Sequence, residues 1–239
     1  MSLLSGLSAQ PETSLTRSDF RVLPVLSANW TGIFYQPKPN ENMVEIEFRS
    51  LARSFDTYQY VGPNPLRFYR ENGLNGENEM TYKLAGQVNL ESPEMLILFM
   101  KKANQMNQIS KEFSLVAMND SPRGLPLNHI SFVNFMSVPF GCRFIDKNVI
   151  LQPGVSQPIS LQANLGEDLF VALVLENNNS HRVVLRNNWE FRNGNRHLVL
   201  LLPPKKAGSY RIRAYRITEF VGENQRFNPD WSPPQVSGQ

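Results

Sequence analysis

Hydrophobic and polar side chains alternate with a period of two along most of the chain, and this pattern predicts β-strands. In residues 43–49, three apolar side chains fall on one face and the charged Glu45, Glu47 and Arg49 fall on the other. A strand with one buried and one solvated face is typical of an antiparallel sheet. Residues 48–55 allow a short helix as an alternative, because their large apolar residues lie three and four positions apart.

A turn in the middle of the chain separates two groups of predicted strands. Ser121-Pro122-Arg123-Gly124 has proline at its second position and glycine at its fourth, which is the preference of a type I turn. The predicted strands lie at 20–26, 43–49, 66–70, 80–88, 95–100, 113–118, 130–135, 139–145, 149–151, 157–161, 169–175, 182–185, 189–192, 197–202 and 210–217. We therefore place the domain boundary at this turn.

The spacing of the strands predicts an all-β fold with two β-sandwich domains, at residues 16–125 and 126–220. The second domain has about nine short strands in roughly 90 residues, which is the density of a β-sandwich. Its clearest turn is Asn193-Gly194, which predicts a type I′ hairpin because these residues accept positive φ values. We find no internal repeat between the two halves.

The two ends of the chain carry a different signal. Gly6, Ser8 and Ala9 follow a short apolar stretch, as at the end of a secretory signal, but no positive region precedes them. This pattern predicts the truncated remnant of a signal peptide and a periplasmic or extracellular location, with a frayed cytoplasmic N-terminus as the alternative. Residues 221–239 are rich in proline and predict an extended tail that Trp231 anchors. No run approaches the roughly 18 apolar residues of a membrane span.

Several short motifs in the second half follow a strand-turn-strand order. They are Ile130-Ser131-Phe132-Val133-Asn134, Val138-Pro139, Phe144, Asp146-Lys147-Asn148, Leu151-Gln152-Pro153-Gly154, Leu202-Pro203-Pro204 and Gly208-Ser209-Tyr210-Arg211. In these motifs, residues 126–217 resemble the Ig-like modules of uncharacterised exported bacterial proteins. The resemblance implies a non-enzymatic envelope or secreted module, and it brings no catalytic residue. The first half of the chain lies outside it.

The sequence contains no complete motif for catalysis or cofactor binding. The only cysteine, Cys142, shares a strand face with Phe140 and Phe144, which predicts a buried and unreactive thiol. The three histidines lie far apart and form no zinc motif, and the glycine-rich phosphate and dinucleotide loops are missing. We therefore predict no cofactor, no metal and a non-catalytic binding or scaffolding role.

Two other functions stay open at this point. A carbohydrate hydrolase is possible in sequence terms because its two carboxylates can lie far apart along the chain, and a coat-like structural sandwich is a further alternative. The acidic residues 71–79 offer oxygen ligands for calcium, but their two Asn-Gly steps favour a hairpin loop. Trp30, Phe34 and Tyr35 could form a sugar-binding platform, but such large rings more often form a core.

Charge is distributed unevenly along the chain. Residues 181–216 carry a net charge of +8, whereas the whole chain carries +3, so the remainder carries −5. Strand alternation points Val183, Leu185, Ile212 and Ala214 inward and the arginines beside them outward. The predicted ligand-binding residues are Arg182, Arg186, Arg192, Arg211, Arg213 and Tyr215. Guanidinium groups match phosphate, sulfate and carboxylate, so we predict an anionic polymer, either polysaccharide or nucleic acid, as the partner. A solvated face that pairs with acidic residues elsewhere is the alternative.

Overall fold

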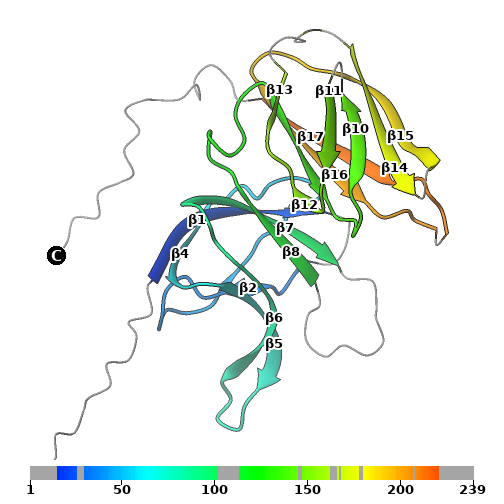
Figure 1. Ribbon diagram of the computed structural model, residues 1–239. Helices are drawn as coiled ribbons and strands as arrows, with labels where there is room; N and C mark the ends of the chain where they lie inside the picture. Colours follow the sequence, from blue (N-terminus) through cyan, green and yellow to red (C-terminus); the bar gives the residue numbers. More distant parts are fainter. Residues whose placement is uncertain are drawn as a thin grey trace, which may run out of the picture. The chain divides into compact units, whose positions relative to one another are not determined.

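The computed structural model describes residues 15–25, 30–101, 113–144, 147–161, 166, 168–177, 180–206 and 208–220 (Figure 1). All the regular secondary structure within these ranges is β-strand, so the all-β prediction is confirmed. The short helix considered for residues 48–55 is wrong, because Arg49 and Ala52 form an isolated β-bridge there. The described part of the chain contains no helix that is long and apolar enough to span a membrane. The predicted signal remnant and C-terminal tail lie outside the described residues.

The chain divides into two compact units, residues 1–117 and 118–239. The first eight strands are β1 (Leu15–Pro24), β2 (Phe34–Tyr35), β3 (Val44–Glu45), β4 (Tyr58–Pro63), β5 (Leu66–Leu74), β6 (Met80–Val88), β7 (Glu94–Lys101) and β8 (Phe113–Asn119). They form two sheets, with strand orders β4-β1-β7-β8 and β3-β2-β5-β6. Strand β1 pairs antiparallel with β4 but parallel with β7, whereas the second sheet is antiparallel throughout.

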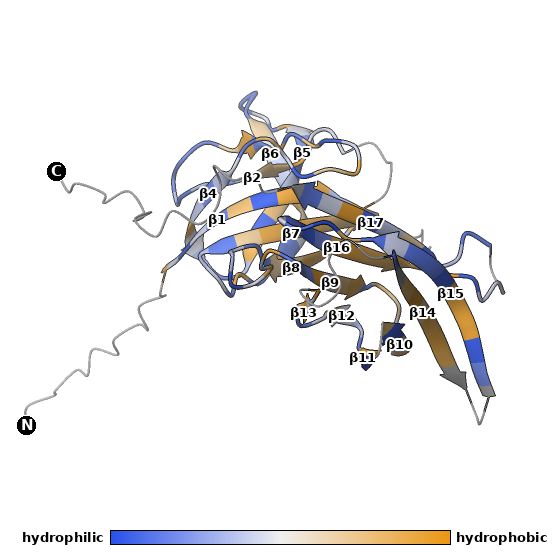
Figure 2. Cartoon of the chain, turned by 90° about the horizontal axis from the view of Figure 1, so that it is seen from above, coloured by the Kyte–Doolittle hydropathy of each residue, from blue (hydrophilic) through white to orange (hydrophobic). Residues whose placement is uncertain are grey.

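Aromatic side chains from both sheets form the core of the first unit. Trp30 and Tyr35 are buried in it, which confirms the core interpretation for these two rings. Phe34 lies on the outer face of its sheet, where its ring contacts Tyr82 at 5.3 Å between centroids. Figure 2 shows how hydrophobic and hydrophilic residues alternate along β1, which is the pattern that buries one face of a strand.

The remaining nine strands belong to the second unit, which also contains the end of β8 from Met118 onward. They are β9 (His129–Asn134), β10 (Phe140–Phe144), β11 (Lys147–Leu151), β12 (Gly154–Val155), β13 (Ile159–Ser160), β14 (Asp168–Asn177), β15 (Ser180–Glu190), β16 (Asn195–Leu202) and β17 (Arg213–Phe220). One sheet has the order β11-β10-β14-β15, and the other has the order β12-β9-β16-β17, with β13 also on β9. Side chains from both sheets meet in one core.

The two units share one strand topology. Strands β12 and β13 pair with successive parts of β9, so they act as a single interrupted strand. When strands are counted within each unit, both units then have the orders 4-1-7-8 and 3-2-5-6. In both units the first strand is parallel to the seventh. The structure therefore contains a repeated topology that the sequence does not reveal.

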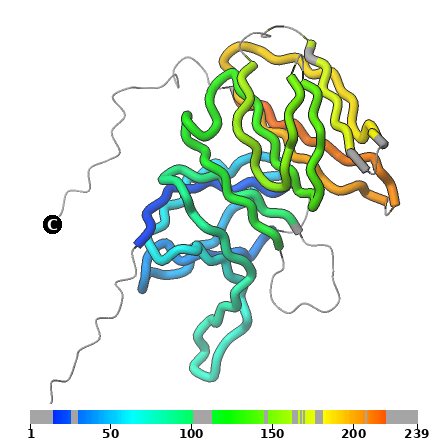
Figure 3. The backbone as a smooth tube through the Cα atoms, viewed as in Figure 1, coloured from blue at the N-terminus to red at the C-terminus, as the bar shows by residue number. Residues whose placement is uncertain are grey.

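The turn at residues 121–124 is present, since the Gly124 N–H donates to the Ser121 carbonyl at 2.9 Å. The hairpin predicted at Asn193-Gly194 is wrong. Strand β15 pairs with β14, while β16 pairs with β9 and β17, so this turn carries the chain from one sheet to the other. The Asn128 side chain accepts the Gly194 N–H at 2.8 Å and holds the crossing in place. The long hairpin of β5 and β6, in contrast, is formed as predicted (Figure 3).

Candidate functional site

Two strands at the edges of different sheets lie side by side in the second unit. Near one end, the guanidinium carbon of Arg182 lies 4.0 Å from the centre of the Tyr210 ring, just before β17. Toward the other end, Arg216 donates to the Glu190 carbonyl at 2.9 Å. Strand β15 and the segment from Tyr210 to Arg216 therefore run in the same direction. The span from Arg182 to Glu190 is roughly 26 Å at a rise of about 3.3 Å per residue.

We call the row formed by Arg182, Arg186, Arg211, Arg213 and Arg216 the basic edge. Its residues come from β15 and from β17 with the segment before it, which are edge strands of two different sheets. Arg186 points outward, 5.6 Å from the exposed Phe170 ring. Arg213 is half-buried and donates to the Pro203 carbonyl at 2.9 Å.

A β-bulge in β15 changes which of its side chains face the core. The flanking pairs are Leu173 with Leu185 and Val174 with Val183. Val184 is therefore an extra residue in β15, and it is buried, whereas Val183 is 50% exposed. The prediction that Val183 points inward is wrong for this reason. Leu185, Ile212 and Ala214 do pack against the core, as predicted.

Most of the lysine and arginine residues in 181–216 form no ion pair with a carboxylate in the described part of the chain. Arg192 does pair, with the Glu190 carboxylate at 3.0 Å. This hydrogen bond and the positive charge of Arg192 hold the pKa of Glu190 below its usual value. Arg196 is held between two carboxylates inside the unit. The residues that form no ion pair with a described carboxylate are Arg182, Arg186, Lys205, Lys206, Arg211, Arg213 and Arg216.

Arg216 belongs to the basic edge although the predicted site did not include it. Its guanidinium carbon lies 5.7 Å from the Trp189 ring centre and 5.6 Å from that of Phe191. Its pairing partner on β16 is the buried Val199, so alternation assigns it to the inner row. Arg216 is nevertheless exposed, because it lies at the edge of the unit beside the end of β15. Tyr215 is half-buried in the outer row, next to Arg213.

Cys142 is 1% exposed and packs in the core of the second unit, which confirms its predicted burial. Burial raises the pKa of the thiol to about 12, so the reactive thiolate is scarce at neutral pH. We expect a thiol reagent to label the native protein far more slowly than the urea-unfolded chain. Absorbance of the released thiolate product at pH 8 measures both rates, and equal rates would contradict this assignment.

His197 is buried in β16, where its Nδ1 lies 3.0 Å from the Thr218 hydroxyl. Burial and the charge of Arg216 lower its pKa to about 4. The unfolded chain, with a histidine pKa of about 6.5, therefore binds a proton at a pH where the folded chain does not. We expect the free energy of unfolding to fall as the pH decreases from about 6.5 to about 4, and to keep this contribution in full above that range.

Urea unfolding of the His197→Gln variant at several pH values tests this expectation. The variant should lose part of the pH dependence, whereas His181→Gln, at an exposed position, should keep it. An unchanged pH profile in the His197→Gln variant would show that this buried imidazole is not the source.

Among the described residues, no three His, Cys, Asp or Glu side chains gather as metal ligands do. The acidic residues 71–79 form the hairpin turn, in which the Asn75 side chain accepts the N–H groups of Glu77 and Glu79. Neither a family model nor a curated protein matches the chain. Function is therefore inferred from the geometry of the basic edge.

Proposed function

We propose that this protein is a non-catalytic, exported or cell-envelope protein with two Ig-like β-sandwich domains, and that it binds an anionic polymer along the basic edge. One observation carries the proposal. Four arginines lie along two adjacent edge strands and form no ion pair with a carboxylate in the described ranges. They are Arg182, Arg186, Arg211 and Arg213. Such a row of cations fits a ligand with repeated negative charges.

The physical chemistry of arginine supports this ligand class. A guanidinium group is always charged and presents a fork of donors that matches phosphate, sulfate and carboxylate. Residues 181–216 hold a net charge of +8 while the rest of the chain holds −5, so a polyanion is attracted to one part of the protein. A row of roughly 26 Å accommodates several charged units of a polymer rather than one small anion.

The motifs in residues 126–217 support the location and the domain type, because they resemble Ig-like modules of exported proteins. The repeated topology extends this proposal to both units. An envelope polysaccharide and a nucleic acid both carry the required charge, and their relative retention in the experiment below distinguishes them.

The combined variant Arg211→Glu plus Arg213→Glu tests the basic edge. We expect wild type to be retained at low salt on a sulfated-polysaccharide column and a DNA column, and the variant to elute at clearly lower salt. The two reversals remove two positive charges and add two negative ones, and they eliminate two counterion-releasing contacts. The salt concentration at elution is the measurement, and circular dichroism checks that the variant is folded.

The matched control is Arg17→Glu plus Arg123→Glu, which changes the net charge equally at two exposed positions outside the basic edge. This control should elute close to wild type. Retention of wild type on neither column, or equal loss in both double variants, would refute a localised binding site. Preferential retention on one column identifies the polymer class.

A further inference from the structure

A pocket of about 190 Å³ lies in the first unit, and no residue of the basic edge lines it. Its walls are β4, the turn between β4 and β5, the first half of β5, and the segment after β2. Pockets for drug-sized ligands have volumes of roughly 300 to 1,000 Å³. The smaller volume here therefore fits one ring-sized group.

Hydrogen bonds between distant segments hold the pocket walls in place. The Val61 N–H donates to the Pro37 carbonyl at 2.8 Å, which ties β4 to the segment after β2. The Asn64 amide donates to the Leu90 carbonyl at 3.1 Å and accepts the Leu90 N–H at 3.0 Å. Since both walls are already fixed, a ligand does not have to order them when it binds.

Tyr60 lines the pocket and remains a neutral hydrogen-bonding group. Its hydroxyl donates to the Pro63 carbonyl at 2.7 Å. Its ring lies so close to Gly62 that a Cβ there would be 2.5 Å from the hydroxyl oxygen. Burial raises the pKa of Tyr60, Tyr69 adds to the increase, and the positive Arg67 opposes it. The phenol therefore stays protonated at neutral pH.

The lining combines rings with positive charge and contains no acidic residue. The half-buried Tyr69 and Pro65 offer flat apolar surface. Lys38 is already bound to Glu41, with 2.9 Å between ammonium and carboxylate. The exposed Arg67 forms no ion pair with any carboxylate that the structure describes. The pocket thus presents one available cation together with the rings of Tyr69 and Pro65.

We propose that this pocket binds a single sugar ring that carries a carboxylate, that is, a hexuronate unit. The apolar face of the ring packs against Tyr69 and Pro65, and the carboxylate binds the guanidinium fork of Arg67. The amide of Gln36, which also lines the pocket, hydrogen-bonds a ring hydroxyl. One available cation matches one carboxylate better than a multiply charged phosphate. The proposal is independent of polymer binding at the basic edge.

Titration of the full chain with sodium glucuronate and with glucose, followed by nuclear magnetic resonance shifts of its backbone amides, tests the site. We expect glucuronate to bind about 10- to 100-fold more tightly than glucose, because one hydrogen-bonded charge pair distinguishes them. Arg67→Gln should abolish this selectivity, and Tyr69→Ala should weaken both sugars. Arg123→Gln, at an exposed position in the second unit, should change neither affinity.

Several outcomes would overturn the proposal. These are equal affinity for the two sugars in wild type, no shift at residues around the pocket, and selectivity that survives Arg67→Gln. Tighter binding of benzoate or of an acidic diproline peptide than of glucuronate would also overturn the sugar assignment. The Arg211→Glu plus Arg213→Glu variant should bind glucuronate as wild type does, so failure at one site is distinguishable from failure at the other.

Discussion

Replacing Phe99 with alanine is expected to lower the free energy of unfolding of the first unit by about 3–5 kcal/mol. Phe99 is fully buried in that unit's core. Its ring centre lies 4.9 Å from those of Phe48 and Phe68, 5.2 Å from Phe113 and 6.0 Å from Trp30. Alanine would leave a cavity that all four rings border, and rings held by strands cannot close it fully. Urea unfolding monitored by fluorescence measures the loss.

Phe55 provides the matched control within the same unit. Its ring is 81% exposed and contacts the Arg49 guanidinium at 3.6 Å. We expect Phe55→Ala to cost less than about 1 kcal/mol, since an exposed cation–π contact contributes little. Similar losses for Phe55→Ala and Phe99→Ala would contradict the core described for the first unit.

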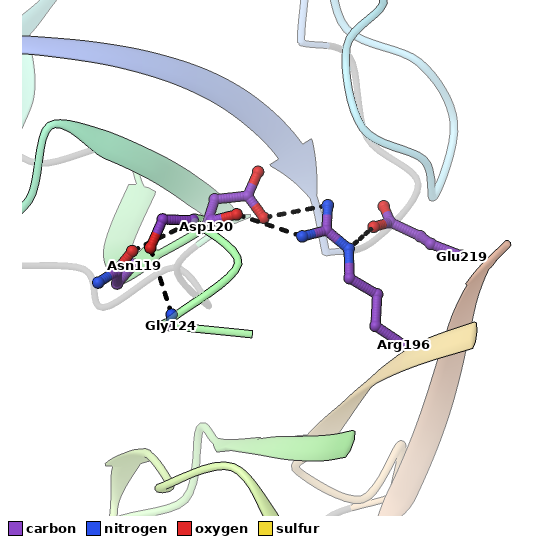
Figure 4. A network of polar contacts seen from close by, with 6 residues as sticks. Asn119, Asp120, Gly124, Arg196 and Glu219 are labelled. Atoms are coloured by element: carbon purple, nitrogen blue, oxygen red, sulfur yellow. Dashed lines mark hydrogen bonds and ion pairs between the residues drawn. The ribbon is translucent and has the colours of Figure 1, made fainter. Parts of the chain in front are cut away.

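Replacing Arg196 with methionine is expected to destabilise the second unit by about 3–5 kcal/mol, because it leaves the buried Asp120 and the half-buried Glu219 without this cation. Arg196 donates to the Glu219 carboxylate at 2.7 Å and to the Asp120 carbonyl at 3.2 Å (Figure 4). Its guanidinium also lies 3.5 Å from the Asp120 carboxylate. The Arg196 side chain is only 11% exposed, so water cannot replace these contacts. The change in urea midpoint is the measurement.

The exposed pair of Arg192 and Glu190 is the comparison for this effect. Its side chains are 74% and 51% exposed, so water screens the pair and Arg192→Ala should change the free energy of unfolding far less than Arg196→Met does. A double-mutant cycle of Arg196→Met with Glu219→Gln should also show strong coupling, because the two groups touch. Equal effects of Arg192→Ala and Arg196→Met, or no coupling in the cycle, would refute a structural role for the Arg196 network.

Local alternation predicted the elements that depend on neighbouring residues. It gave the all-β class and the buried Cys142, which follow from the period of two in a strand with one buried face. The core positions of Trp30 and Tyr35 followed instead from the large apolar area of their rings. The hairpin at residues 71–79 was also predicted, because its turn lies within one short stretch of sequence.

The connection from β15 to β16 could not be predicted from local alternation. The Asn193-Gly194 step favours a tight hairpin locally, yet β16 pairs with β9, far away in the sequence. Parallel pairing of β9 and β16 buries the apolar face of β16 in the core, and this gain outweighs the preference of the turn. The same non-local pairing produces the topology that both units share, without any similarity between their sequences.

The candidate site divides along the same line. The concentration of positive charge in residues 181–216 could be recognised from the amino acids alone, because charge is a property of composition. The arrangement of that charge depends on how the strands pack in the folded chain. The bulge at Val184 turns Val183 toward solvent, and Arg192 pairs with a carboxylate. Arg216 lies at the basic edge although alternation assigns it to the inner row. These placements depend on strand order and on contacts across the core, which alternation along one strand does not specify.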